Sequence, residues 1–138
     1  MSALFEVLSK IQKEMKAPKS QYNAFGKYKY RSCEDILEAV KPFLNGTVLY
    51  ISDEMVLIGD RYYIKATATL RNGDEAVSVT AYAREEAEKK GMDSSQITGA
   101  ASSYARKYAL NGLFLIDDTK DSDATNEHGK GEAANSKP

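Results

Sequence analysis

Two stretches of the chain combine cationic and aromatic side chains in patterns that suit binding to unpaired nucleic acid. In the first stretch, Lys27, Lys29 and Arg31 alternate with Tyr28 and Tyr30. In an extended segment the cations would point to one side and the rings to the other. Binding to single strands without sequence preference uses cations for the phosphates and rings for the bases. The candidate contacts in this stretch are Lys19, Lys27, Tyr28, Lys29, Tyr30 and Arg31. The alternative is a solvated basic loop above buried tyrosines.

The second stretch is the pair Arg106 and Lys107, which follows a run of small residues. Small neighbours permit close approach of a strand, and an arginine can grip a phosphate through two parallel hydrogen bonds. An ion pair of Arg106 with a nearby glutamate is the alternative, and the candidates are Glu85, Glu86 and Glu88. Tyr104 and Tyr108 share a helical stripe with Ile97 and Ala101, so we expect core packing for them rather than base stacking.

The charge is distributed unevenly, although the net charge is only −1. Residues 1–31 hold seven basic side chains and two acids, 7 − 2 = +5, whereas residues 117–138 hold six acids and three lysines, 3 − 6 = −3. A basic end beside an acidic one fits a nucleic-acid binder better than the average charge suggests. The acidic end could compete with DNA for the basic residues, or it could simply be solvated.

Composition leaves little for catalysis. The chain has one cysteine, Cys33, and one histidine, His128, which lies in a polar tail. No phosphate-binding Gly-x-x-x-x-Gly-Lys-Ser/Thr loop is present, and the acids near Asp117 lack the glycine and distal glutamate of an EF-hand. We therefore expect no enzyme activity, no cofactor and no metal. No long apolar stretch or signal pattern occurs, so we expect a cytoplasmic location and no membrane partner.

The periodicity predicts an α+β fold, in which an antiparallel three-stranded meander packs with helices. Helices are expected over residues 2–16, from Ser32 to Leu44 with Asn45-Gly46 closing the helix, and over 94–110, with a hairpin or turn around Gly26. Strands are expected over 47–58, 61–71 and 75–84, and the middle strand places Tyr62, Ile64, Ala66, Ala68 and Leu70 on its buried side. A charged turn or linker is expected over 85–90. Residues 1–118 would form one domain, and 119–138 an acidic disordered tail.

Two longer motifs contain the residues singled out above together with their neighbours. The first runs from Phe25-Gly26-Lys27-Tyr28-Lys29-Tyr30-Arg31-Ser32 into Glu34-Asp35-Ile36 and Lys41-Pro42-Phe43-Leu44. The second runs from Gly99-Ala100-Ala101-Ser102-Ser103-Tyr104-Ala105-Arg106-Lys107-Tyr108-Ala109-Leu110 through Asn111-Gly112-Leu113-Phe114 to Ile116-Asp117-Asp118. Two motifs about seventy residues apart are far more specific than either motif alone. In this order they resemble the motifs of the ERF (essential recombination function) family of phage single-strand annealing proteins.

The resemblance implies a protein that binds single-stranded DNA, anneals complementary strands without ATP and assembles into a ring or filament. It also implies a strand-strand-strand-helix core shared with other annealing proteins, a bacterial host or prophage setting, and a phage nuclease or a host single-strand binding protein as partner. Two other functions stay open: protection of single strands without annealing, and a protein-interaction scaffold that does not touch DNA.

Overall fold

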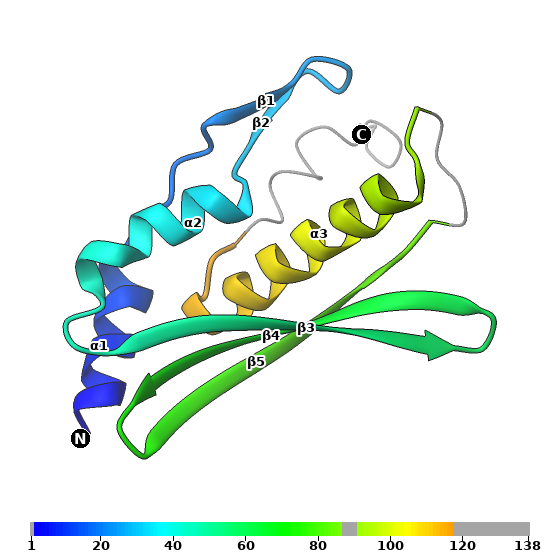
Figure 1. Ribbon diagram of the computed structural model, residues 1–138. Helices are drawn as coiled ribbons and strands as arrows, with labels where there is room; N and C mark the ends of the chain where they lie inside the picture. The colour runs from blue at the N-terminus through cyan, green and yellow to red at the C-terminus, as the bar shows by residue number, and fades with distance from the viewer. Residues whose placement is uncertain (1, 87–90, 118–138) are drawn as a thin grey trace, which may run out of the picture.

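The computed structural model describes residues 2–86 and 91–117 and shows a small α+β domain (Figure 1). The elements in chain order are α1 (Ala3–Glu14), β1 (Gln21–Asn23), β2 (Tyr28–Tyr30), α2 (Cys33–Val40), the 3-10 turn η1 (Lys41–Phe43), β3 (Val48–Ile58), β4 (Arg61–Asn72), β5 (Glu75–Arg84) and α3 (Ser94–Phe114). The predicted class is confirmed, because β3, β4 and β5 form an antiparallel sheet packed against helices.

The sheet is a meander with β4 in the centre. β3 pairs with β4 from Val48 opposite Arg71 to Ile58 opposite Arg61, and β4 pairs with β5 as far as Asn72 opposite Glu75. Two residues therefore close each hairpin. The first residue of each turn is a glycine with positive φ, 64° at Gly59 and 63° at Gly73, a conformation that side chains with a Cβ disfavour.

One face of the sheet is buried under α3. Ile64, Ala66, Ala68 and Leu70 are at most 4% exposed, as their alternation along β4 predicts. Tyr62 continues this pattern and yet is 48% exposed. The β3–β4 hairpin extends past the start of α3 at that end (Figure 1), so the helix does not cover Tyr62.

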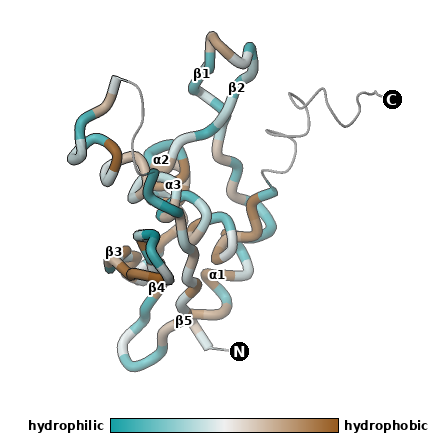
Figure 2. The backbone as a smooth tube through the Cα atoms, turned by 90° about the vertical axis from the view of Figure 1, so that its right-hand side faces the viewer, coloured by the Kyte–Doolittle hydropathy of each residue, from teal (hydrophilic) through white to brown (hydrophobic). Residues whose placement is uncertain are grey.

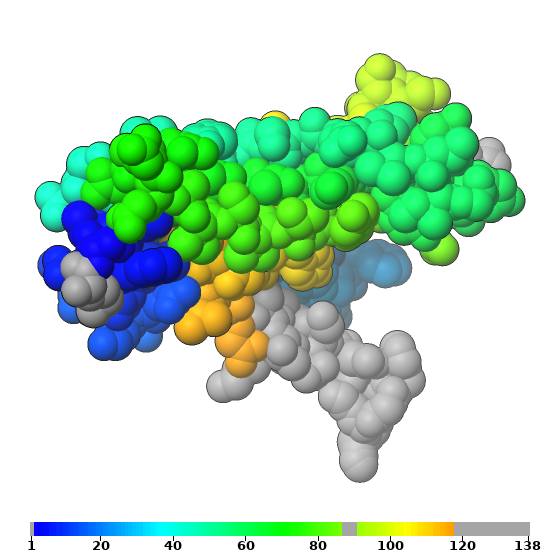
Figure 3. Space-filling model, turned by 90° about the horizontal axis from the view of Figure 1, so that it is seen from below, coloured from blue at the N-terminus to red at the C-terminus, as the bar shows by residue number. Residues whose placement is uncertain are grey.

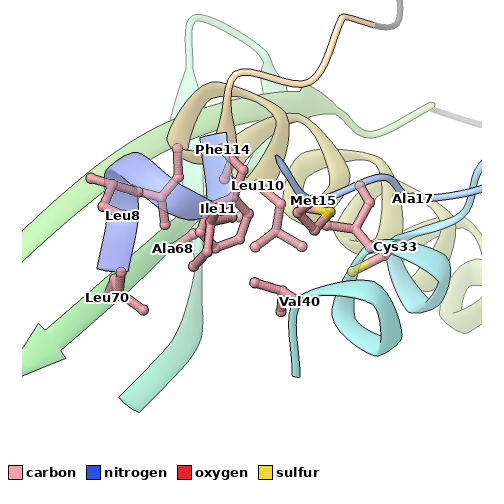
Figure 4. Close-up of a cluster of buried hydrophobic side chains, with 14 of the residues drawn as sticks. Leu8, Ile11, Met15, Ala17, Cys33, Val40, Ala68, Leu70, Leu110 and Phe114 are labelled. Carbon is pink, nitrogen blue, oxygen red and sulfur yellow. The ribbon is translucent and has the colours of Figure 1, made fainter. Parts of the chain in front are cut away.

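The main core lies where α1, α2, α3 and β4 meet (Figure 4). Its largest fully buried side chains come from all four elements: Phe114, Leu4, Ile11, Ile36, Leu70, Leu110, Leu113 and Val40. Two helix ends differ from expectation. α2 stops at Val40, because Pro42 has no N–H to continue the α-helical hydrogen bonds, and a short 3-10 turn follows. α3 continues to Phe114, where Leu115 closes it with a left-handed φ of 57°.

The face of α3 that meets the sheet is built from small residues. Ala101, Ala105 and Ala109 are at most 5% exposed. At Gly112 an added Cβ would lie 2.8 Å from the Val79 side chain of β5. Helix and sheet therefore approach closely along this stripe, while Leu110, Leu113 and Phe114 at the end of the helix belong to the main core.

The β1–β2 hairpin stands away from the main sheet (Figures 1 and 2). Its turn is held by Asn23, whose side chain accepts a hydrogen bond from the Gly26 N–H at 2.9 Å and donates to the Tyr28 hydroxyl at 3.2 Å. Lys27 has a φ of 58° and belongs to this turn. The alternation of cations and rings in an extended strand thus applies to Tyr28–Tyr30 and does not include Lys27.

Candidate nucleic-acid interface

The two basic stretches of the sequence meet where the end of β2 and the start of α2 face the middle of α3. A pocket of about 230 Å³ lies at this junction. On one side it is lined by Tyr30 and Arg31 from the first stretch and by Ser32 and Cys33 at the start of α2, and on the other side by Ala100, Ser103, Tyr104 and Lys107 of α3. The residues of the two stretches are more than sixty positions apart in the chain, so only the tertiary fold brings them together.

A capping box holds the first half of this pocket in place. Ser32 caps α2: its hydroxyl accepts a hydrogen bond from the Asp35 N–H at 3.1 Å, and the Asp35 carboxylate accepts one from the Ser32 N–H at 2.8 Å. The Ser20 hydroxyl also donates to Asp35. Burial alone would raise the pKa of Asp35, but the hydrogen bonds from Ser20 and Ser32 outweigh it and lower this pKa. The capping box thereby fixes the direction of the chain at Tyr30 and Arg31, between the end of β2 and the start of α2.

Lys107 is the cation that α3 contributes to the pocket. It is only 8% exposed, and its Nζ lies 5.8 Å from the centre of the Tyr30 ring and 5.9 Å from that of Tyr108. Both distances fall within the range of cation–π attraction. Burying a lysine costs free energy unless other groups compensate its charge, so the aromatic rings are part of what keeps an ammonium here.

Tyr104 and Tyr108 lie on the surface, and the prediction that they pack in the core is wrong. They are 55% and 48% exposed, and their rings stack on each other with centres 6.5 Å apart and planes 16° from parallel. The physical reason is the close approach of α3 to the sheet, because only its alanine stripe fits there. Since both alanines and tyrosines recur at helical spacing, the sequence pattern did not decide which stripe faces inward.

Arg106 diverges from Lys107 and does not line the pocket. Its Nε donates to both oxygens of Asp53 on β3, at 3.0 and 3.2 Å, and the Ser102 hydroxyl donates to the same carboxylate. The alternative interpretation, in which Arg106 forms an ion pair, is therefore confirmed, but the expected partner is wrong. The partner is Asp53 and not one of the candidates Glu85, Glu86 and Glu88. Of these three, Glu88 lies outside the described residues.

The other residues predicted to contact nucleic acid differ in whether they line the pocket. Arg31 also lines a neighbouring pocket of about 280 Å³ and donates from Nε to the Ala17 carbonyl at 3.1 Å. Tyr28 lies 6.0 Å from Tyr30, measured between ring centres, so the two rings share one side of the hairpin as expected. Lys27 and Lys29 are exposed and Lys19 is half-buried, but none of the three lines the pocket.

Cys33 is a buried residue that lines the pocket. Burial raises the pKa of its thiol to about 11, and the negative charge of Glu34 adds to this effect. A thiol with such a pKa carries almost no thiolate near neutral pH. Cys33 therefore contributes to the pocket as a small apolar side chain.

The described part of the chain offers no cluster of three metal-binding side chains. Asp118, Asp121 and Asp123 lie outside it, as do residues 119–138 of the predicted tail and most of the predicted 85–90 linker. None of the helices in residues 2–86 and 91–117 has the length and apolar character needed to cross a bilayer.

The fold and the site together define an α+β protein with a basic and aromatic junction between a β-hairpin and a long helix. The chain belongs to the ERF superfamily, whose family model matches residues 4–138, and the resemblance seen in the two motifs is thereby confirmed. It is 69% identical over 121 residues to the essential recombination function protein of Salmonella phage P22. This match covers 88% of the chain and 58% of the relative, so the chain spans little more than half of that protein's length. No solved structure shows a significant match.

Proposed function

We propose that this chain acts in phage recombination by binding single-stranded DNA and annealing complementary strands without a nucleotide cofactor or a catalytic step. Membership of the ERF superfamily and the identity to a phage protein named for recombination support the recombination role. The observation that carries the DNA-binding part is the junction of Tyr30, Arg31 and Lys107 with the exposed Tyr104 and Tyr108. We call these five residues the hairpin–helix surface.

The hairpin–helix surface has the two kinds of group that an unpaired strand requires. Tyr104 and Tyr108 expose flat rings, and stacking of a base on an aromatic ring contributes roughly 1–3 kcal/mol without selecting a sequence. Lys107 and Arg31 place positive charge beside these rings, where phosphates follow the bases. Lys27 and Lys29 on the adjoining hairpin extend the positive charge beyond the pocket. Annealing then needs only that bases stay displayed while phosphate repulsion between strands is neutralised.

Assembly into a homo-oligomer belongs to the proposal. A protomer that neutralised about four phosphates would show a slope of log affinity against log salt of roughly −3, which is weak binding for one site. Neighbouring protomers on one strand would raise the avidity by orders of magnitude without new chemistry. The strands β3 and β5 form the two edges of the described sheet, and such edges are suitable contacts between copies.

The test compares the wild type with a Tyr104→Ser/Tyr108→Ser variant in two assays at low salt. Fluorescence anisotropy with a labelled oligo-dT reports binding, and the pairing rate of two complementary labelled oligonucleotides reports annealing. We expect the variant to bind about tenfold or more weaker, from the lost stacking, and to lose the acceleration of pairing. Phe5→Ser, which removes a 48% exposed ring from α1, is the matched control and should change neither result.

Each contrary outcome identifies what fails. If the wild type does not bind the oligonucleotide, the chain does not act on single strands and a protein scaffold becomes the better description. If it binds but does not accelerate pairing, it protects strands without annealing them. If the double variant binds as tightly as the wild type, the hairpin–helix surface is not the DNA site.

A further inference from the structure

The second face of the main sheet is uncovered in the described part of the chain. The helices α1 and α3 pack on the face that carries Ile64 and Ala66, and Figure 3 shows the opposite face of β3, β4 and β5 open to solvent. Strand register assigns this outer face its side chains. They are Tyr50, Ser52, Glu54 and Val56 from β3, Arg61, Tyr63, Lys65, Thr67, Thr69 and Arg71 from β4, and Ala76, Ser78, Thr80, Tyr82 and Arg84 from β5, with Val48 and Ile58 at the ends of β3.

The outer face is strongly cationic. Among its side chains are four basic ones, Arg61, Lys65, Arg71 and Arg84, and one carboxylate, Glu54, so the balance on this face is 4 − 1 = +3. The chain as a whole has a net charge of −1. Positive charge is therefore concentrated on this face, which favours a polyanionic ligand.

Each of the three tyrosines on the outer face has a cation as its neighbour. The Arg71 guanidinium lies 6.0 Å from the centre of the Tyr50 ring, and its Nε donates to the Tyr50 hydroxyl at 3.0 Å. Lys65 is directly opposite Tyr82, and Arg84 is directly opposite Tyr63. Tyr50 and Tyr82 are 42% and 51% exposed. Rings that alternate with cations on a rigid sheet are the arrangement that unpaired bases and their phosphates fit.

The centre of the outer face is polar, which argues against an apolar protein contact. Thr67 and Thr80 hydrogen-bond across the strands at 3.2 Å, and Thr69 and Ser78 at 2.8 Å. Interfaces between proteins usually concentrate apolar side chains in the middle and charges at the rim. Here the hydroxyls occupy the middle, and the apolar Val48 and Ile58 lie at the ends of the strand.

We propose that the outer face of the β3-β4-β5 sheet binds a second single strand of nucleic acid, and this inference rests on the proposed function. The hairpin–helix surface involves α3, on the covered side of the sheet, so the two surfaces face different directions. One protomer would then hold two separate strands and bridge them. Bridging raises the local concentration of one strand near the other, which speeds the encounter that annealing needs.

The test removes the cation–ring pattern from the outer face in the full chain. The sheet variant is Lys65→Gln/Tyr82→Ser/Arg84→Gln. Its matched control, Phe5→Ser/Lys10→Gln/Lys13→Gln, removes two cations and one exposed ring from α1. Protein bound to oligo-dT on beads is offered a fluorescent oligo-dT, which cannot pair with the first. We expect the sheet variant to retain about tenfold less of the second strand than the control does, while its affinity for the first strand changes little.

Photo-crosslinking locates the second strand directly. An oligonucleotide that contains 5-bromodeoxyuridine is cross-linked to the Tyr104→Ser/Tyr108→Ser variant, and the modified peptides are identified by mass spectrometry. We expect cross-links in the peptides that contain Tyr50, Tyr63 or Tyr82. Cross-links confined to other elements, or a sheet variant that retains the second strand as the control does, would overturn the inference.

Light scattering separates DNA binding from contact between copies. If the sheet variant changes the oligomeric mass while the α1 control does not, the outer face is a protein interface and the inference is wrong. Binding of the first strand by the wild type distinguishes a failure of this inference from a failure of the proposed function. If the wild type binds no strand, both proposals are contradicted. If the wild type binds a strand and the sheet variant retains the second strand as the control does, only this inference is contradicted.

Discussion

The ammonium of Lys107 lies 5.8 Å from the centre of the Tyr30 ring, although the two residues belong to motifs that are far apart in the sequence. This contact connects β2 to α3 at the pocket where both basic stretches meet. Lys107 is 8% exposed, so water screens its charge poorly and the ring is a substantial part of its surroundings. Stability and binding should therefore depend on the same pair.

We expect measurable coupling between Tyr30 and Lys107. In a double-mutant cycle with Tyr30→Leu and Lys107→Met, the coupling free energy from urea unfolding should be about 0.5–2 kcal/mol in favour of the wild-type pair. The control cycle combines Tyr30→Leu with Lys41→Met, because Lys41 is an exposed lysine that pairs with Glu38. A Tyr30–Lys107 coupling as small as that of the control cycle would show that the contact contributes nothing.

The close approach of α3 to β5 makes two glycines of one helix respond oppositely to alanine. A Cβ at Gly112 would lie 2.8 Å from Val79, so Gly112→Ala should lower the free energy of unfolding by about 1–3 kcal/mol. Gly99 has open space at this position, and Gly99→Ala should raise it by roughly 0.5–1 kcal/mol through helix propensity. Thermal unfolding of both variants checks this. If the two alanine substitutions changed the stability equally, the close packing of Gly112 against Val79 would be contradicted. Adding Val79→Ala should partly rescue Gly112→Ala.

The course of the chain could be predicted from sequence because local signals agreed. The glycines that begin the two sheet turns, the alternation along β4 and the capping residue Ser32 each specify structure within a few residues. The hairpin pairings follow from those turns, and the meander follows from the hairpins. The elements were therefore predicted to within about four residues, and the largest shifts are the ends of α2 and α3, which were expected at Leu44 and Leu110 and lie at Val40 and Phe114.

The side chains that make the site could be predicted only in part, because tertiary packing decided their direction. Tyr104 and Tyr108 look like core residues until α3 is placed against Ala66 and Ala68, where only its alanines fit. Arg106 and Lys107 are adjacent in sequence, but about 100° separates them around the helix, and one meets Asp53 while the other meets Tyr30. A repeated alanine stripe at helical spacing is the signal that could have reversed the assignment.

The capping box at α2 should contribute stability that disappears in acid. Hydrogen bonds lower the folded-state pKa of Asp35 below its ordinary value of 3.8. The contribution of its carboxylate is therefore present above about pH 4 and is lost as the pH falls through the lower folded-state value. Asp35→Ala should reduce the free energy of unfolding by about 1 kcal/mol at pH 7. Urea unfolding of the wild type and the variant at pH 7 and below pH 3 checks this. If the difference in unfolding free energy between the two proteins were the same at both pH values, the role assigned to the Asp35 carboxylate would be contradicted.

The buried thiol of Cys33 should be unreactive in the native protein and should weaken the fold in alkali. Its pKa is raised from 9.0 to about 11, first by burial. At pH 8 a disulfide reagent should therefore modify native Cys33 at least about tenfold more slowly than the urea-unfolded chain, because thiolate is the reacting form.

The raised folded-state pKa of Cys33 also determines how the stability of the fold should change with pH. The stabilising contribution is complete below pH 9 and is lost as the pH rises towards 11, because the unfolded thiol ionises first. Cys33→Ala should remove this part of the alkaline loss while other groups keep theirs, so the difference between wild type and variant should narrow from pH 8 to pH 10. A thiol that reacts equally fast in the native and unfolded chains would show that Cys33 is accessible to solvent in the native protein.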